Sequence, residues 1–152
     1  MSVRILVDAD ACPVKEEIYK VAFRHDVPVT LVTNQHLRVP PHPLIERITV
    51  GAGFDAADDW IAEATAPGAV VVTNDILLAD RCLKAGAAAV LSPIGKPFTT
   101  SSIGAAIATR AIMADLRAGM GEGVGGPAPF SKADRSRFLQ ALDEALVRAK
   151  RG

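Results

Sequence analysis

A chain of 152 residues with 49% apolar residues has the length usual for one domain and enough apolar material for one sizeable core. Its 17 Lys and Arg balance 17 Asp and Glu, so the formal net charge is zero. This balance argues against a protein that binds nucleic acid mainly through a strong basic field.

Five short apolar runs rich in Val, Ile and Leu predict the strands of a sheet. None alternates cleanly with polar residues, and such runs are typical of strands that are buried on both faces between layers of helices. The runs cover residues 3–7, 28–32, 47–50, 69–72 and 87–91. We therefore expect residues 1–152 to form a single α/β domain of three layers, with a five-stranded, mainly parallel sheet and additional C-terminal helices.

Helical patterns separate these runs and follow the last of them. The first begins at Pro13, a residue suited to the first helical position, and the next two begin near Asp55 and Asp75. Residues 92–104 predict a loop whose hydroxyl side chains cap a further helix, which ends at Gly119. The apolar stripe expected on that helix includes Ile103, Ala106, Ile107, Met113 and Ala114.

The segment 119–130 contains five glycines and two prolines, so it predicts a mobile connection and no regular element. Ser131 and Asp134 then resemble a capping pair at the start of a last helix over residues 131–150. The stripe that this helix is expected to bury consists of Phe138, Ala141, Leu142, Ala145, Leu146 and Ala149.

The amino-terminal segment lacks a secretory signal, and no apolar run approaches the roughly 20 residues of a membrane span. Cys12 and Cys82 fit no zinc spacing and predict no disulfide framework, which favours a reducing compartment. We therefore expect a cytoplasmic protein that makes no membrane contact.

Aspartates follow the first and fourth predicted strands directly. Asp8 and Asp10 lie two residues apart after the first strand and can point the same way if the chain stays extended, while Asp75 follows the fourth strand. Ligands of open α/β sheets bind outside the carboxyl ends of the strands where the strand order reverses, and strands one and four commonly flank that point. We expect these three side chains to converge.

Asp55 and Asp58 lie three residues apart at the start of the second predicted helix, so they share a face. Carboxylates about 5 Å apart repel by roughly 3 kcal/mol at an effective dielectric near 20, and a bound cation would offset that repulsion. Oxygen ligands suit Mg²⁺ or Mn²⁺, so Asp8, Asp10, Asp55, Asp58 and Asp75 are the predicted metal ligands. As an alternative, Asp55, Asp58 and Asp75 also suit ordinary helix starts.

Two further polar residues are predicted substrate contacts. Asn34 ends the second strand, and Thr99 lies in the hydroxyl-rich segment before the fourth helix. Cys12 has no indicated histidine partner, so a small buried side chain is the better interpretation.

Four motifs closely resemble the YaiI/YqxD family of uncharacterised bacterial proteins. They are VDADACPVK at 7–15, GFDAADDWI at 53–61, VVVTNDILLADRCLKAGA at 70–87 and GGPAPFSKADRSRF at 125–138. More distantly, the arrangement is similar to a PIN-like domain, in which acids after the first strand, in the middle helix and after the fourth strand bind Mg²⁺ or Mn²⁺ for phosphodiester hydrolysis. Asp8 matches the first acid, Asp55 or Asp58 the middle one, and Asp75 the later one.

The leading hypothesis is therefore a metal-dependent nuclease that hydrolyses phosphodiester bonds, with RNA or another single-stranded nucleic acid as its partner and RNA favoured over DNA. Asp8, Asp10 and Asp75 are its predicted catalytic residues. An alternative is a haloacid-dehalogenase-like phosphohydrolase, with Asp8 as nucleophile, Asp10 as acid and base, and Thr33 as a phosphate contact. A third interpretation is a non-catalytic module that binds RNA or a protein through the metal.

Overall fold

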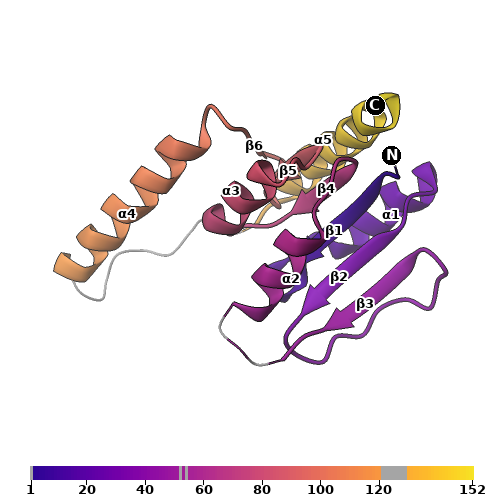
Figure 1. Ribbon diagram of the computed structural model, residues 1–152, viewed down its shortest axis with the longest axis horizontal. Helices are drawn as coiled ribbons and strands as arrows, with labels where there is room; N and C mark the ends of the chain where they lie inside the picture. Colours follow the sequence, from indigo (N-terminus) through magenta and orange to yellow (C-terminus); the bar gives the residue numbers. More distant parts are fainter. Residues whose placement is uncertain (1, 52, 54, 121–129) are drawn as a thin grey trace.

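A twisted sheet lies between two layers of helices (Figure 1). The computed structural model describes residues 2–51, 53, 55–120 and 130–152, without the side chains of 11 and 114–120. Within this part of the chain the strands form one six-stranded sheet of order β3-β2-β1-β4-β5-β6. The strands are β1 (Arg4–Asp8), β2 (Val29–Thr33), β3 (Ile45–Thr49), β4 (Ala69–Val72), β5 (Ala89–Leu91) and β6 (Pro97–Phe98). The expected α/β class is confirmed.

The neighbouring pairs among β1 to β5 are parallel, as expected, whereas β6 runs antiparallel to β5. This sixth strand was not predicted, because a proline beside a glycine turn is typical of a loop. Gly95 has a φ of 82° in the turn that joins β5 to β6, a backbone conformation that glycine adopts without strain. Pro97 is tolerated because β6 is only two residues long and lies at the edge of the sheet.

The helices cover both faces of the sheet. They are α1 (Lys15–His25), α2 (Ala56–Ala64), α3 (Ile76–Lys84), α4 (Ile103–Met120) and α5 (Lys132–Arg151), and a short 3₁₀ helix, η1 (Ala9–Ala11), precedes α1. Successive side chains of a strand point to opposite faces. Val7 accordingly joins the core under α1 and α5, whereas Leu6 joins the core under α2 and α3.

The start of α1 differs from the prediction. Pro13 was expected to be the first helical residue, but η1 occupies Ala9–Ala11 and Cys12 has extended backbone angles. The helix therefore begins only at Lys15, after Val14. The starts of α2 and α3 are as predicted, because Asp55 and Asp75 are their N-cap residues.

The carboxyl-terminal helix α5 packs as its sequence predicts. Ser131 and Asp134 form a reciprocal capping box, so two amide groups at the helix start are satisfied by side chains. The predicted stripe faces the core, with Phe138, Leu142, Ala145 and Leu146 buried and Ala141 and Ala149 partly buried. Arg135 ties this helix to α1 by donating hydrogen bonds to the carbonyl oxygen of Pro13 at 2.9 Å and to Glu17 Oε1 at 3.1 Å.

Helix α4 departs from its predicted packing. Ile103 is buried and Ile107 packs partly against the core of α2 and α3, but Met113 is 43% exposed, so the expected stripe does not bury its whole length. The helix extends away from the sheet (Figure 1). Of the glycine-rich segment expected at 119–130 to be mobile, residues 121–129 lie outside the described residues. In the described part of the chain, no helix combines the length and apolar character needed to cross a membrane.

Leu142→Ala tests the packing of α5. Leu142 is fully buried, so we expect the free energy of unfolding to fall by about 2–5 kcal/mol through lost burial and the cavity left behind. Urea unfolding measures the change, with the exposed Gln140→Ala on the same helix as control. A loss near zero for Leu142→Ala would contradict the observed packing.

Candidate functional site

The carboxyl end of β1 lies where the strand order reverses. The chain passes from β1 to β2 and β3 on one side, then returns to β4 on the other side of β1. Val32 of β2 pairs with Asp8, and Val72 of β4 pairs with Val7. Thr33 and Thr73, the residues after these partners, therefore flank Asp8 at the edge where open α/β sheets bind ligands.

Asp8 is partly buried and held by a hydroxyl group. Thr73 Oγ1 donates a hydrogen bond of 3.0 Å to Asp8 Oδ2. Loss of solvent raises the pKa of Asp8, and the negative charges of Asp75 and Asp10 raise it further, while the hydrogen bond from Thr73 acts in the opposite direction. This carboxylate is thus kept among other acids in surroundings that disfavour its charged form.

Asp10 faces the other neighbour of β1. Thr33 Oγ1 donates to Asp10 Oδ1, and the backbone amide of Asn34 donates to Asp10 Oδ2 at 3.0 Å. The extended backbone that would point Asp8 and Asp10 the same way is absent here, because Asp10 lies in η1, where three residues make a turn. Asp8 therefore bonds toward β4 and Asp10 toward β2.

Asp75 combines a structural role with a place in the site. Its Oδ1 accepts hydrogen bonds from the backbone amides of Leu77 at 2.9 Å and Leu78 at 3.2 Å, so it caps α3. Its own amide donates to Thr73 Oγ1 at 3.0 Å. Thr73 thus links Asp75 to Asp8, and the predicted convergence of these two acids is observed.

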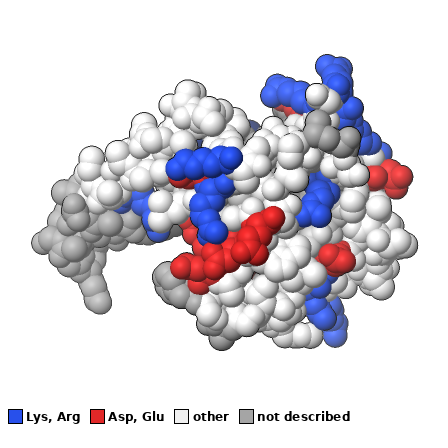
Figure 2. Space-filling view, in the orientation of Figure 1, with Lys and Arg blue, Asp and Glu red and all other residues white. Residues whose placement is uncertain are grey.

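The first turn of α2 adds Asp58 to this group. Loss of solvent, followed by the charges of Asp75, Asp8 and Asp55, raises the pKa of Asp58 to about 6. Arg81 lowers that pKa, but its Nη1 is bonded to Asp59 at 2.9 Å. Figure 2 shows acidic side chains gathered over α2 with basic side chains over α3 beside them.

Asp55 is the N-cap residue of α2 but accepts no capping hydrogen bond through its side chain. The alternative that it serves as an ordinary helix cap is therefore not supported. We use the name acidic cluster for Asp8, Asp10, Asp55, Asp58 and Asp75, which influence one another electrostatically.

In the described part of the chain, the acidic cluster does not form an enclosed metal cage. Among the described residues, no three His, Cys, Asp or Glu side chains are arranged to hold one metal ion. Mg²⁺ commonly binds through one or two carboxylates, keeps several waters and adds substrate phosphates. Asp8 and Asp58 suit binding of this hydrated kind, because each carboxylate has at least one oxygen atom that makes no hydrogen bond with the described residues.

The two predicted substrate contacts lie in different places. Asn34 is exposed at the end of β2, beside Asp10. Thr99 is also exposed, but it lies before α4, where its Oγ1 donates to Ser102 Oγ at 2.9 Å. No hydrogen bond among the described residues joins Thr99 to the acidic cluster, and its role stays a prediction.

Thr33 is 0% exposed, which does not favour the phosphohydrolase alternative that uses it as a phosphate contact. Thr73 was not predicted to contribute. The sequence feature that could have indicated Thr73 is its position directly after an apolar run, since a parallel neighbour of the first strand places it opposite Asp8. Burial also raises the pKa of the Cys12 thiol, in agreement with a small buried side chain.

Residues 6–148 of the chain match the family described as "Uncharacterized BCR, YaiI/YqxD family". The chain belongs to this family. It is 77% identical over 148 residues to a UPF0178 protein of Sphingopyxis alaskensis, which covers 97% of this chain and 96% of that relative. It is 63% identical over 147 residues to a UPF0178 protein of a Jannaschia species, with 96% and 94% covered. No solved structure matches the sequence.

The family resemblance inferred from the sequence motifs is thereby confirmed, and the likeness to PIN-like domains stays a prediction. The motif VDADAC of this YaiI/YqxD family member contains Asp8 and Asp10, and the motif TND contains Thr73 and Asp75. These two motifs therefore meet in space through the hydrogen bonds of Thr73.

Asp58→Asn tests the electrostatic crowding. The folded protein holds the pKa of Asp58 near 6, above the ordinary 3.8, so it binds more protons than the unfolded chain between these values. The contribution of Asp58 to the free energy of unfolding therefore decreases as the pH rises through this window. In EDTA, we expect Asp58→Asn to remove that decrease and to raise the melting temperature at pH 7.

Thermal melts from pH 4 to pH 8 measure this effect, and Glu63→Gln, an exposed neutralisation on the same helix, is the control. Equal pH profiles for the wild type and Asp58→Asn would show that Asp58 is not crowded by the other acids.

Thr33→Val tests the hydroxyl that binds Asp10. The substitution keeps the shape of a fully buried side chain but removes the donor, so we expect a loss of about 1–3 kcal/mol in the free energy of unfolding. Urea unfolding measures it. Thr49→Val, the same substitution at an exposed position of β3, should change stability by less than about 0.5 kcal/mol.

Proposed function

We propose that this protein is a divalent-cation-dependent nuclease that hydrolyses phosphodiester bonds, with RNA preferred over DNA. The observation that supports it is the pair Asp8 and Asp58, partly buried carboxylates whose pKa values are raised by burial and by neighbouring acids at the switch point of the sheet. Such crowding favours a site that takes up positive charge. The preference for RNA rests on the resemblance to PIN-like domains.

Bound Mg²⁺ or Mn²⁺ would offset the charge of the carboxylates, polarise a phosphate oxygen and promote ionisation of a bound water for attack on phosphorus. Asp8 and Asp58 are the residues proposed to hold the cation. Asp75 Oδ2, the oxygen that makes no capping hydrogen bond with α3, is the third proposed contact. Thr73 orients Asp8 through its hydroxyl. Asp10 holds the end of β2 against η1, so it positions Asn34 at the exposed edge.

The direct test is an incubation of purified protein with single-stranded RNA and DNA of the same sequence, with Mn²⁺ or with EDTA. We expect RNA cleavage that requires Mn²⁺ and falls about a hundredfold or more in Asp8→Asn. Glu63→Gln is the control and should keep wild-type activity. Saturable binding of RNA without any product, with Mn²⁺ present, would contradict the nuclease and support a binding module.

The proposed function also predicts whether Asp8→Asn raises or lowers the melting temperature in the absence and in the presence of the cation. In EDTA, Asp8→Asn should leave the melting temperature unchanged or raise it, because one crowded charge is lost. A cation that binds only the folded state adds about 2.7 kcal/mol at one hundred times its dissociation constant, and Asp8→Asn should lose most of that gain in Mn²⁺. Asp75→Asn should behave similarly, because asparagine also caps helices.

Thermal melts in EDTA and in millimolar Mn²⁺ decide between the two roles of these aspartates. If both substitutions lower the melting temperature equally in the two buffers, Asp8 and Asp75 are structural residues and the proposed cation site is wrong.

A further inference from the structure

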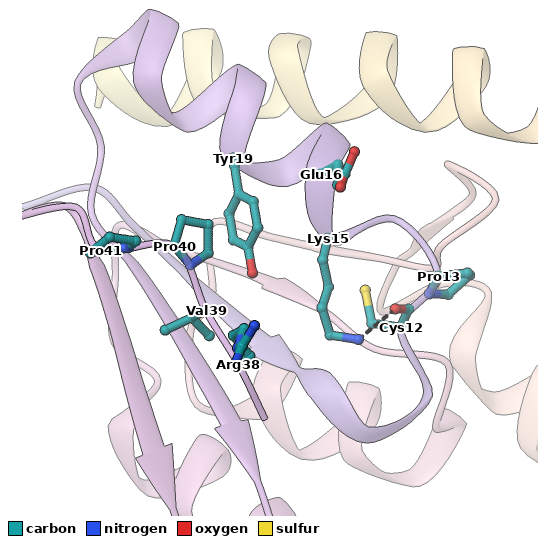
Figure 3. A pocket seen from close by; sticks show the side chains of 9 residues that line it. All are labelled: Cys12, Pro13, Lys15, Glu16, Tyr19, Arg38, Val39, Pro40 and Pro41. Carbon is teal, nitrogen blue, oxygen red and sulfur yellow. Dashed lines mark hydrogen bonds between the residues drawn. The ribbon is translucent and has the colours of Figure 1, made fainter. Parts of the chain in front are cut away.

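A second site lies beside the acidic cluster, in a cavity of about 550 Å³ between the start of α1 and the proline-rich loop after β2. Its size is within the range of small-molecule sites. Figure 3 shows the hydroxyl of Tyr19 directed toward the side on which Arg38 and Val39 lie, and the Lys15 head group turned to the carbonyl oxygen of Cys12. The cavity is lined by Cys12, Pro13, Lys15, Glu16, Tyr19, Arg38, Val39, Pro40 and Pro41.

Tyr19 is a largely buried residue of the cavity lining. Its side chain packs in the core, and the residue is only 8% exposed. Its hydroxyl makes no hydrogen bond with a described residue. Among those residues, every fully buried side-chain oxygen has a hydrogen-bond partner, so a hydroxyl without one is accessible to solvent. The hydroxyl must therefore reach the cavity. Burial, with the nearby Cys12 and Glu16, raises the pKa of Tyr19, so the hydroxyl keeps its proton and is a donor at neutral pH.

The cations of the cavity are free of carboxylate partners among the described residues. Lys15 Nζ donates to the carbonyl oxygen of Cys12 at 2.9 Å and has two further protons to donate. Arg38 makes no hydrogen bond or ion pair in the described part of the chain and lies between this cavity and a second one of about 580 Å³, which Arg47 also lines. By contrast, Arg24, Arg81 and Arg135 each pair with a carboxylate.

We propose that the Tyr19 cavity binds a phosphate group of a nucleotide, with Lys15, Arg38 and Tyr19 as its donors. A guanidinium, an ammonium and a phenol together match the several acceptor oxygens and the negative charge of a phosphate. Val39, Pro40 and Pro41 supply an apolar wall against which a ribose or base can pack. Glu16 is exposed and carries the one acidic side chain of the lining.

The Tyr19 cavity and the acidic cluster are joined by Asp10. Cys12 and Pro13 follow Asp10 by two and three residues, and the loop that carries Arg38 begins just after Asn34, whose amide binds Asp10. A nucleic-acid strand can thus place one phosphate at the carboxylates and another at the cations. This placement on the strand rests on the proposed nuclease function, whereas phosphate binding by the cavity does not.

Adenosine 5′-monophosphate is the probe, and adenosine is its phosphate-free control. Isothermal titration calorimetry in EDTA excludes cation binding at the acidic cluster. We expect Tyr19→Phe and Arg38→Ala each to weaken binding of adenosine monophosphate about tenfold, the effect of losing one hydrogen bond to a charged group. Arg148→Ala removes an exposed arginine of the last turn of α5, and it should bind like the wild type.

Adenosine should bind at least about tenfold more weakly than its monophosphate. The inference is overturned if adenosine and its monophosphate bind equally, if neither binds at millimolar concentration, or if Arg38→Ala binds as the wild type does. Arg38 is exposed, so its removal keeps the test valid even if Tyr19→Phe does not fold.

Short RNAs with and without a 5′-phosphate identify the source of the phosphate. Tighter binding of the 5′-phosphorylated RNA assigns the cavity to a strand end, and equal binding that still depends on Arg38 assigns it to an internal phosphodiester. RNA cleavage is measured in parallel with Mn²⁺. A protein that binds adenosine monophosphate through Tyr19 and Arg38 but cleaves no RNA contradicts the proposed function and leaves the phosphate site in place.

Discussion

Hydroxyl groups hold the two aspartates that follow β1. Thr73 donates to Asp8 from the β4 side, and Thr33 donates to Asp10 from the β2 side. Both threonines lie where they do because the parallel register aligns the strand ends, so the sheet itself sets the direction of each carboxylate. A hydroxyl donor orients a carboxylate without neutralising its charge.

Asp8 and Asp10 form their hydrogen bonds with opposite neighbours of β1. Asp8 belongs with Asp58 and Asp75 on the side of α2 and α3. Asp10 ties η1 to the end of β2, from which the chain continues toward Arg38. A chain with zero net charge is therefore compatible with both proposals, a cation at the carboxylates and a phosphate at the Tyr19 cavity, because opposite charges that are separated in space cancel only in the total.

The sequence predicted the layers and the meeting of Asp8 with Asp75, because continuous apolar runs indicate strands buried on both faces and the acids follow two of those runs directly. It could not predict the turn at Asp10, since an extended chain and a 3₁₀ turn place the same residues differently. The exposure of Met113 was missed because periodicity shows which residues share a face but not what covers that face. The donors facing the Tyr19 cavity come from separate segments, which only the folded loop brings together.

The two border strands of the sheet bear on how copies of this protein could associate. β3 carries exposed Glu46 and Arg47 and follows a loop with three prolines, while β6 consists of two residues, one of them Pro97. Charged side chains, prolines and short length all discourage the addition of a strand from another chain. Sheet extension is thus disfavoured at both borders, which favours other surfaces for any self-association; among the large apolar side chains that the structure describes, Ile112 of α4 is the most exposed, at 60%.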